Sequence, residues 1–262
     1  MCGIAGIVHF DNKRADPDRI QLMLDKIRHR GPDDQGIYVK DQVGLGHVRL
    51  SILDLSAAGH QPMLSNDGRY YLVFNGEIYN YLDLKKELSP VYDFKSKTDS
   101  EVLLAAYITW GENCLSRFNG DFSFVIYDTF ENSLFGARDR FGIKPFYYLH
   151  DSNQFIFASE IKAILPLTEQ RTPNDKIIFE YLVYNRTDQS EETFFNGILK
   201  LKHGHCFTLK GGLMKIKKWY DLGAMVHYPR PMHASEFRME LSKSIQLRLQ
   251  SDVPVGVSLS GG

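Results

Sequence analysis

The second residue of the chain, Cys2, is a thiol directly after the initiator methionine. Removal of Met1 would place a thiol and a free α-amine on the same residue. An α-amine has a pKa of about 7.7–8.0 and a thiol one of about 8.5, so the amine can accept the thiol proton near neutral pH. Cys2 is therefore a candidate nucleophile that needs no histidine, although a cysteine at this position can also be accidental.

A nucleophile that attacks an amide needs hydrogen-bond donors for the oxyanion that develops. Asn75, Gly76 and Glu77 follow the run Tyr70–Phe74, which predicts a strand. The Asn75 carboxamide and the Gly76 N–H could meet at the oxyanion, because glycine lets the backbone approach closely. The alternative interpretation is a hairpin turn, a common use of Asn-Gly.

Recognition of a free amino acid requires a cation for its carboxylate and an anion for its ammonium group. Arg49, at the end of one predicted strand, and Asp99, before a predicted helix, are the candidates. The alternative is that both are surface charges at element ends, because spacing alone does not show that they converge.

The elements that must position these residues follow from the hydrophobic pattern. Asp16 can cap a helix that starts at Pro17, carries Ile20, Met23, Leu24 and Ile27 on one face, and stops at Gly31-Pro32. Tyr81–Leu88, Glu101–Trp110 and Ser235–Gln250 also predict helices. Predicted strands are Gly3–Phe10, Val43–Arg49, Tyr70–Phe74, Phe122–Tyr127, Leu134–Ala137, Gln154–Ala158 and Val253–Leu259. Antiparallel sheets covered by helices are the expected arrangement.

The composition of the 262 residues excludes several classes of protein. The 31 basic and 32 acidic side chains give a net charge of −1, so no field gathers nucleic acid or an anionic membrane. The 3 cysteines form no CxxC pattern, which predicts neither a disulfide framework nor a zinc site and favours the cytoplasm. No signal peptide or membrane-spanning stretch is expected.

Several short motifs now identify a family resemblance. They are Met1-Cys2-Gly3-Ile4-Ala5-Gly6, His29-Arg30-Gly31-Pro32-Asp33, Gly46-His47-Val48-Arg49-Leu50-Ser51-Ile52, Phe74-Asn75-Gly76-Glu77-Ile78-Tyr79-Asn80, Thr98-Asp99-Ser100-Glu101, Asn119-Gly120-Asp121-Phe122, Ala137-Arg138-Asp139-Arg140-Phe141-Gly142-Ile143-Lys144-Pro145 and Phe157-Ala158-Ser159-Glu160-Ile161-Lys162. In this order they resemble class II glutamine amidotransferases over essentially the whole chain.

The resemblance implies a role for each matching residue. Cys2 would be the nucleophile, and Asn75 and Gly76 would form the oxyanion hole. L-glutamine would be held by Arg49, Leu50, Ser51, Ile52, Leu53, Asn75, Gly76, Glu77 and Asp99. The implied fold is α+β, the four-layer αββα sandwich of N-terminal-nucleophile hydrolases, and hydrolysis of glutamine would need no cofactor.

The last residues of the chain indicate which class II glutamine amidotransferases it resembles most. Asp252-Val253-Pro254-Val255-Gly256 and the following residues up to Gly262 resemble the opening of the pyrophosphate-binding loop of asparagine synthetases. This implies an amidotransferase domain over 2–210, a linker over 211–232 and, over 233–262, the first helix and strand of an α/β ATP-pyrophosphatase domain. Leu259, Ser260, Gly261 and Gly262 would be the first edge of an ATP site.

For the full-length enzyme, the resemblance implies ATP and Mg²⁺ as cofactors and L-aspartate as the acceptor, all three bound by a domain that is expected to be missing here. A homodimer is left open. This chain would then support only the glutaminase half. The alternative for Ser260-Gly261-Gly262 is a flexible turn, in which Ser-Gly-Gly is common.

Three rival functions stay open: transfer of ammonia to a sugar phosphate or phosphoribosyl acceptor, amidation of a carboxylate other than aspartate, and a non-catalytic glutamine-binding module. The tail argues against the first and Cys2 against the last.

Two other groups of residues could suggest sites but are not assigned any. His203, His205 and Cys206 lie in one short segment with no second ligand cluster, so a strand after a tight turn is expected and not a metal site. Arg138, Arg140 and Lys144 are expected to form a structural loop, not a phosphate site.

Overall fold

The computed structural model describes residues 1–262 apart from 12, 170, 227–230 and 259–262. Its chain forms two compact units that interleave along the sequence. The first unit comprises Met1–Leu50, His60–Glu77 and Gly120–Tyr220, and the second comprises Ser51–Gly59, Ile78–Asn119 and Asp221–Gly262.

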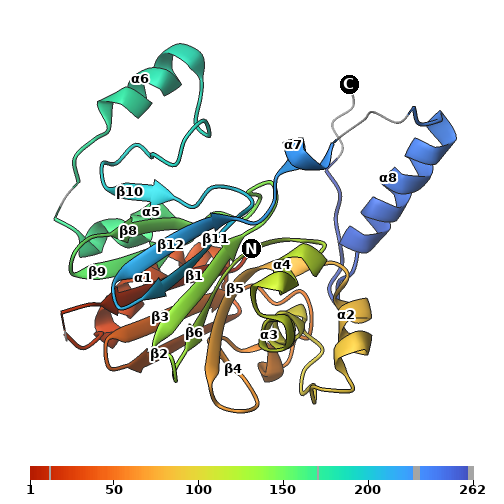
Figure 1. Ribbon diagram of the computed structural model, residues 1–262, viewed down its shortest axis with the longest axis horizontal. Helices are drawn as coiled ribbons and strands as arrows, with labels where there is room; N and C mark the ends of the chain where they lie inside the picture. The colour runs from red at the N-terminus through yellow and green to blue at the C-terminus, as the bar shows by residue number, and fades with distance from the viewer. Residues whose placement is uncertain (12, 170, 227–230, 259–262) are drawn as a thin grey trace. The chain divides into compact units, whose positions relative to one another are not determined.

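Two antiparallel sheets form the first unit (Figure 1). One sheet has the order β10-β8-β9-β1-β3-β2, from β1 (Gly3–His9), β2 (Asp34–Lys40), β3 (Val43–Arg49), β8 (Tyr147–His150), β9 (Gln154–Ala158) and β10 (Ile198–Lys200). The other has the order β12-β11-β7-β6-β5-β4, from β4 (Met63–Leu64), β5 (Tyr70–Ile78), β6 (Gly120–Asp128), β7 (Ser133–Arg138), β11 (His205–Lys210) and β12 (Leu213–Lys218). The α+β class with antiparallel sheets is therefore confirmed.

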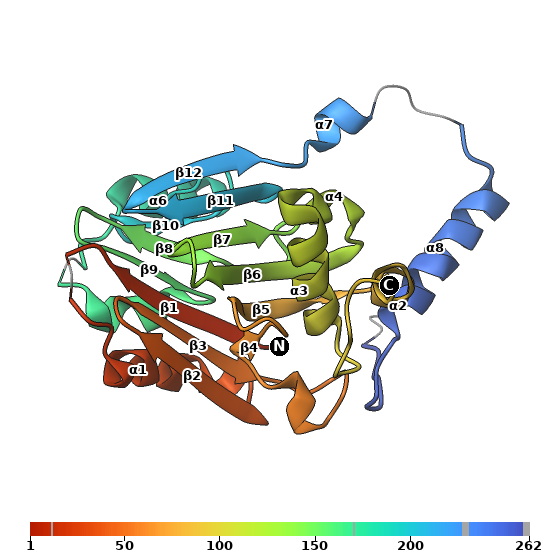
Figure 2. The same cartoon turned by 60° about the horizontal axis from the view of Figure 1, so that its bottom comes forward.

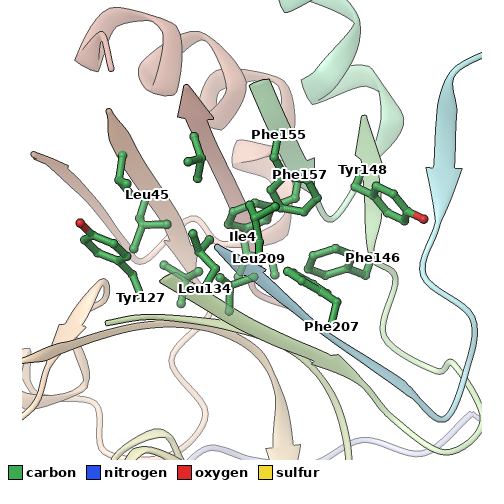
Figure 3. Packing of buried hydrophobic residues seen from close by; sticks show 14 of the residues in the cluster. Ile4, Leu45, Tyr127, Leu134, Phe146, Tyr148, Phe155, Phe157, Phe207 and Leu209 are labelled. Atoms are coloured by element: carbon green, nitrogen blue, oxygen red, sulfur yellow. The ribbon is translucent and has the colours of Figure 1, made fainter. Parts of the chain in front are cut away.

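The main core lies between the two sheets. Figure 3 shows Ile4, Phe155 and Phe157 of one sheet against Leu134, Phe207 and Leu209 of the other. The rings of Phe146 and Phe157 stack with their centroids 5.6 Å apart. Burial of such aromatic and aliphatic surface, at about 25 cal/mol per Å², holds the sheets face to face.

Strand β1 is buried on both faces, as its unbroken apolar sequence predicts. Ile4 and Val8 point into the core between the sheets, while Ala5 and Ile7 join a second core under helices. The alternation follows from the two-residue period of a strand. Both neighbours of β1 are antiparallel: β3, with Gly3 opposite Val48, and β9, with Ala5 opposite Ala158. Figure 2 shows β1 and β3 side by side.

Helices α1 (Pro17–Ile27) and α5 (Ile161–Ile164) cover the outer face of the first sheet. The Asp16 side chain caps α1 by accepting a 2.9 Å hydrogen bond from the Asp18 N–H. The predicted face of Ile20, Met23, Leu24 and Ile27 is buried, so this helix is confirmed. Helix α6 (Asp175–Tyr184) also belongs to the first unit.

The second unit contains α2 (Tyr81–Leu88), α3 (Asp99–Trp110), α4 (Cys114–Arg117), α7 (Leu222–Met225) and α8 (Ala234–Arg248). Helices α2 and α3 pack against each other. The Thr98 side chain caps α3 and the Glu101 carboxylate accepts hydrogen bonds from the Ser96 N–H and hydroxyl, so the start of this helix is firmly held. Asp99 is thus the first residue of α3, two residues earlier than the predicted start.

Two predicted elements differ from the structure. Strand β5 continues through Asn75 and Gly76 to Ile78, so these residues lie inside a strand, and the hairpin-turn alternative is wrong. No strand forms over residues 253–258, because this segment has no strand neighbour in either sheet of the described chain to complete its hydrogen bonds. Residue 259 lies outside the described residues.

No helix in the described part of the chain has both the length and the apolar character needed to cross a membrane.

Candidate active site

Cys2 stands immediately before β1, and the pairing of β1 with β3 places it beside the end of β3. The Leu50 N–H donates to the Cys2 Sγ at 3.4 Å, and Sγ lies 3.7 Å from the Leu50 carbonyl oxygen. The Arg30 Nε donates to the Cys2 carbonyl at 2.9 Å. The thiol is half-buried and its backbone is fixed, which suits a nucleophile that must be both positioned and reachable.

The α-amine of the chain lies in a charged environment next to this thiol. Burial lowers the pKa of the Met1 α-ammonium; Cys2 and Glu77 raise it, while Arg30 and Lys144 lower it further. The net decrease in pKa favours the neutral form of the Met1 amine. The same interactions show that Glu77 and Lys144 lie within electrostatic reach of the terminus.

Side chains from other segments hold the backbone of β5 just before Asn75. The Phe74 N–H donates to the Gln61 Oε1 at 2.7 Å, and the Phe74 carbonyl lies 2.9 Å from the His47 Nε2. Burial lowers the pKa of His47 to about 4, so its ring is neutral at pH 7 and donates through Nε2. These bonds make the strand a rigid support for the residues that follow.

The Asn75 carboxamide is 1% exposed, and neither its Nδ2 nor its Oδ1 has a hydrogen-bond partner among the described residues. Buried amide groups are normally paired, so an unsatisfied one needs an explanation. A donor that is already desolvated and fixed is what an oxyanion requires.

Gly76 is a glycine because of close packing and not because of a left-handed backbone. A Cβ at this position would lie 2.4 Å from the Asp121 carbonyl oxygen and 2.7 Å from the Phe122 Cα. Only glycine lets β5 approach β6 this closely.

Glu77 is partly buried at the same end of β5. Burial raises its pKa, and Asp121 raises it further, whereas Lys144 and the chain terminus act in the opposite direction. Because its pKa is raised, the Glu77 carboxylate loses its charge, and with it its affinity for a cation, at a higher pH than an ordinary glutamate does.

The other residues predicted to bind glutamine are divided between the units. Arg49 and Leu50 lie in the first unit, and Ser51, Ile52, Leu53 and Asp99 lie in the second. Arg49 and Asp99 are each 5% exposed, so the alternative that they are surface charges is wrong. The Asp99 Oδ2 accepts from the Ile78 N–H at 2.9 Å, and the Ile52 carbonyl accepts from the Asp252 N–H at 2.9 Å.

The predicted ATP-site residues Leu259, Ser260, Gly261 and Gly262 lie outside the described residues.

The segment with His203 and His205 forms a turn and the start of β11. The His205 Nδ1 bonds the His203 carbonyl at 2.8 Å, and Cys206 is buried at 2% exposure. Across residues 1–258, apart from 12, 170 and 227–230, no group of three or more His, Cys, Asp or Glu side chains is arranged to hold a metal ion.

Hydrogen bonds made by Arg138 and Asp139 stabilise the loop at the end of β7. Arg138 donates to the carbonyls of Lys144, Leu201 and Gly142 at 2.7–2.8 Å. The Asp139 carboxylate accepts from the N–H groups of Phe122, Phe141, Ile143 and Lys144. The Arg138 side chain therefore has the structural role that was predicted for it.

Three residues that contact the site were given no role from the sequence: Arg30, His47 and Gln61. Arg30 and His47 stand within motifs that carry the family resemblance. Gln61 had no sequence signal, because its contact with Phe74 depends on the packing of a loop against β5.

Comparisons with known proteins show which proteins this chain is similar to. A glutamine amidotransferase domain model matches residues 1–220. A putative glutamine-hydrolysing asparagine synthetase of Methanocaldococcus jannaschii is 37% identical, with 100% of this chain and 55% of that protein covered. Asparagine synthetase 3 of Bacillus subtilis is 34% identical, with 100% and 44% covered. Amidase chry2 of Gibberella zeae is also 34% identical, with 100% and 41% covered.

The chain therefore spans about half the length of the relatives that it matches. Among solved structures, the glutamine phosphoribosylpyrophosphate amidotransferase of B. subtilis superposes with a TM-score of 0.61 at 21% identity, over 84% of this chain and 49% of that one. A match at 21% identity shows similarity of the fold alone. The family model and the relatives together show that the chain belongs to the glutamine amidotransferase domain family.

Proposed function

We propose that this chain is the glutamine-hydrolysing part of a glutamine-dependent asparagine synthetase, acting through Cys2 after removal of Met1. The observation that carries the proposal is the Cys2 thiol, held by the Leu50 backbone at 3.4 Å in a chain that also has a buried, unsatisfied Asn75 carboxamide. The relatives named as asparagine synthetases support the choice of reaction.

The reaction would proceed in two steps. The Cys2 α-amine accepts the thiol proton, and Sγ attacks the side-chain carbonyl carbon of glutamine. Asn75 and Gly76 donate to the oxyanion, and its collapse expels ammonia with a proton returned from the amine. Water then attacks the thioester, which releases glutamate and the thiol.

Glutamine would be oriented by opposite charges. Arg49 would bind the α-carboxylate, while Glu77 and Asp99 would attract the α-ammonium. Ser51, Ile52 and Leu53 would line the pocket with their backbone. Burial of Arg49 and Asp99 supports this assignment, since ion pairs with a ligand are stronger away from water.

The proposal extends to the architecture. The fold would be the four-layer αββα sandwich of N-terminal-nucleophile hydrolases, and α8 would be the first helix of an ATP-pyrophosphatase domain. Phe237, Leu241 and Ile245 repeat every four residues on α8 and are 61%, 49% and 50% exposed, which supports the idea that more protein covers this face.

With the rest of such an enzyme, ammonia would amidate aspartate using ATP and Mg²⁺ in the cytoplasm. Leu259 to Gly262 would contribute to the nucleotide site.

A second candidate is amidation of a different carboxylate. Amidase chry2, which matches over the whole of this chain, supports keeping this candidate because its name does not refer to asparagine. Both candidates share the glutaminase step.

The test is glutamate release from glutamine by the purified chain, with the N-terminal mass measured alongside. Cys2→Ala should abolish release and keep the fold, as judged by circular dichroism. Cys206→Ala, which removes the other thiol of the first unit, is the control and should retain activity. Glutamate release by the Cys2→Ala variant would refute the proposal.

A further inference from the structure

The residues that follow β9, Ser159 and Glu160, help to hold the first residues of the chain. Ser159 and Ile4 exchange two hydrogen bonds: the Ile4 N–H donates to the Ser159 Oγ at 3.0 Å, and the Ser159 N–H donates to the Ile4 carbonyl at 2.9 Å. Ser159 is fully buried. These bonds fix the start of β1.

The next residue, Glu160, reaches the Cys2 backbone through Arg30. The Arg30 Nη1 donates to the Glu160 Oε1 at 2.9 Å, and the Arg30 Nε donates to the Cys2 carbonyl at 2.9 Å. The Arg30 side chain is only 9% exposed. Glu160, Arg30 and Cys2 therefore form a continuous chain of charge-assisted hydrogen bonds.

We propose that Glu160 is a positioning residue for the Cys2 nucleophile, acting by fixing the guanidinium of Arg30 against the Cys2 carbonyl. The inference rests on the proposed glutaminase function and deepens it. Glu160 itself contacts neither the thiol nor any residue predicted to bind glutamine, so its effect must pass through Arg30.

The geometry explains why Arg30 needs this support. Two of its three guanidinium nitrogens are anchored, Nε by Cys2 and Nη1 by Glu160, while the buried Nη2 has no hydrogen-bond partner among the described residues. Without Glu160, only the bond to Cys2 would hold a largely desolvated cation, and water would compete for it.

The carbonyl that Arg30 binds sets the orientation of Cys2. Rotation of the peptide group between Cys2 and Gly3 moves the thiol and the amine relative to the fixed strand. Gly3 is itself held in β1, where it lies opposite Val48 of β3. A loosened Arg30 would therefore misplace the reacting sulfur.

Glu160 also binds two other side chains near it. It accepts from the His29 Nε2 at 3.0 Å and from the Lys162 Nζ at 2.9 Å, and Tyr147 lies within electrostatic reach of both Glu160 and Arg30. Partial burial would raise the pKa of Glu160, but the hydrogen bonds from Lys162 and Arg30 outweigh it and lower the pKa. Glu160 is thus an anion at neutral pH.

The test compares Glu160→Gln with Glu191→Gln in the full chain. The control removes a carboxylate of the same unit that pairs with Lys202 at 2.6 Å, away from Cys2. Two quantities are measured: the hydrogen-exchange rate of the Arg30 Nε–H by ¹⁵N NMR, and kcat and KM for glutamine as functions of pH.

In the wild type and in Glu191→Gln, the Arg30 Nε–H should be protected from exchange. In Glu160→Gln, exchange should accelerate by about tenfold or more, because the neutral amide accepts only a weaker hydrogen bond from Arg30 than the carboxylate does. The plateau of kcat over pH should fall by roughly tenfold or more, with KM within about twofold, since a misplaced reacting group lowers the rate at every pH.

Two outcomes would overturn the inference. One is an Arg30 Nε–H that stays protected in Glu160→Gln. The other is an unchanged kcat plateau with only a shifted pH midpoint, which would assign Glu160 a purely electrostatic role. If the wild type releases no glutamate, the proposed function fails, and the exchange measurement alone decides whether Glu160 fixes Arg30.

Discussion

Asn75 is a buried polar side chain that has no hydrogen-bond partner in the part of the chain that the structure describes. Burying an amide in this state costs about 1–3 kcal/mol. The cost is explained if the carboxamide is held ready for an oxyanion, because a donor engaged elsewhere would have to break a bond during the reaction. Stability and activity are thus opposed at this residue.

Asn75→Leu should separate the effect of this residue on stability from its effect on activity. Leucine has a similar size and no polar atoms, so the free energy of unfolding should rise by about 1–2 kcal/mol. The kcat for glutamate release should fall by about 10²–10³-fold, the loss expected for one oxyanion donor. Urea unfolding and a glutaminase assay measure both quantities.

Asn80→Leu is the matched control. The Asn80 Nδ2 donates to the Arg117 carbonyl at 3.0 Å, and its Oδ1 accepts from the Asn119 N–H at 2.9 Å. Because this amide is satisfied, its replacement should lower the free energy of unfolding. A decrease of similar size in Asn75→Leu would contradict the interpretation of Asn75.

The raised pKa of Glu77 predicts how the affinity for glutamine depends on pH. Its pKa is raised above the usual 4.5 by burial and by Asp121, against the opposing effects of Lys144 and the chain terminus. Below the raised pKa the carboxyl is neutral and cannot attract the α-ammonium of glutamine. The affinity for glutamine should therefore weaken on acidification, starting at a higher pH than an ordinary glutamate would give.

Calorimetric titration of the Cys2→Ala variant with glutamine, between about pH 8 and pH 5, measures this affinity without turnover. Glu77→Gln should bind glutamine more weakly at pH 8 and lose most of the pH dependence. An identical pH dependence in Glu77→Gln would assign the effect to another group.

At the scale of elements, β5 and β6 approach too closely for any side chain at Gly76. In Gly76→Ala, the new methyl group would meet the Asp121 carbonyl at 2.4 Å and the Phe122 Cα at 2.7 Å, both backbone atoms that cannot rotate away. The strands must separate, and the free energy of unfolding should fall by roughly 1–3 kcal/mol. Glutaminase activity should fall with it, because Asn75 and Glu77 are carried on the displaced strand.

The control for this change is Gly256→Ala. A Cβ at Gly256 meets no atom within 4 Å, and the backbone there is not left-handed. The free energy of unfolding should change by less than about 0.5 kcal/mol. Thermal unfolding of the two variants tests the difference, and equal stability would show that β5 and β6 can accommodate a side chain.

At the scale of the whole molecule, the chain leaves the first unit within the predicted glutamine-binding segments. It passes to the second unit between Leu50 and Ser51 and again between Glu77 and Ile78. Two of the motifs that carry the family resemblance, 46–52 and 74–80, thus run from one unit into the other.

The sequence alone determined the elements whose contacts are local. The cap at Asp16 and the apolar face of α1 follow from the 3.6-residue period, and the buried β1 follows from its unbroken apolar run. The eight short motifs between Met1 and Lys162 were together sufficient to predict the family, because each motif lies within a few consecutive residues.

Only the tertiary structure decided the features that depend on distant partners. It extended β5 through Asn75 and Gly76, where the dipeptide alone would equally suit a turn, and residues 253–258 formed no strand for lack of a neighbour. It also joined Glu160 to Cys2 through Arg30, although Arg30 and Glu160 are 130 residues apart in the sequence. A hydrogen bond between segments far apart leaves no periodic signal in the sequence, because its geometry is set by the packing of the whole core.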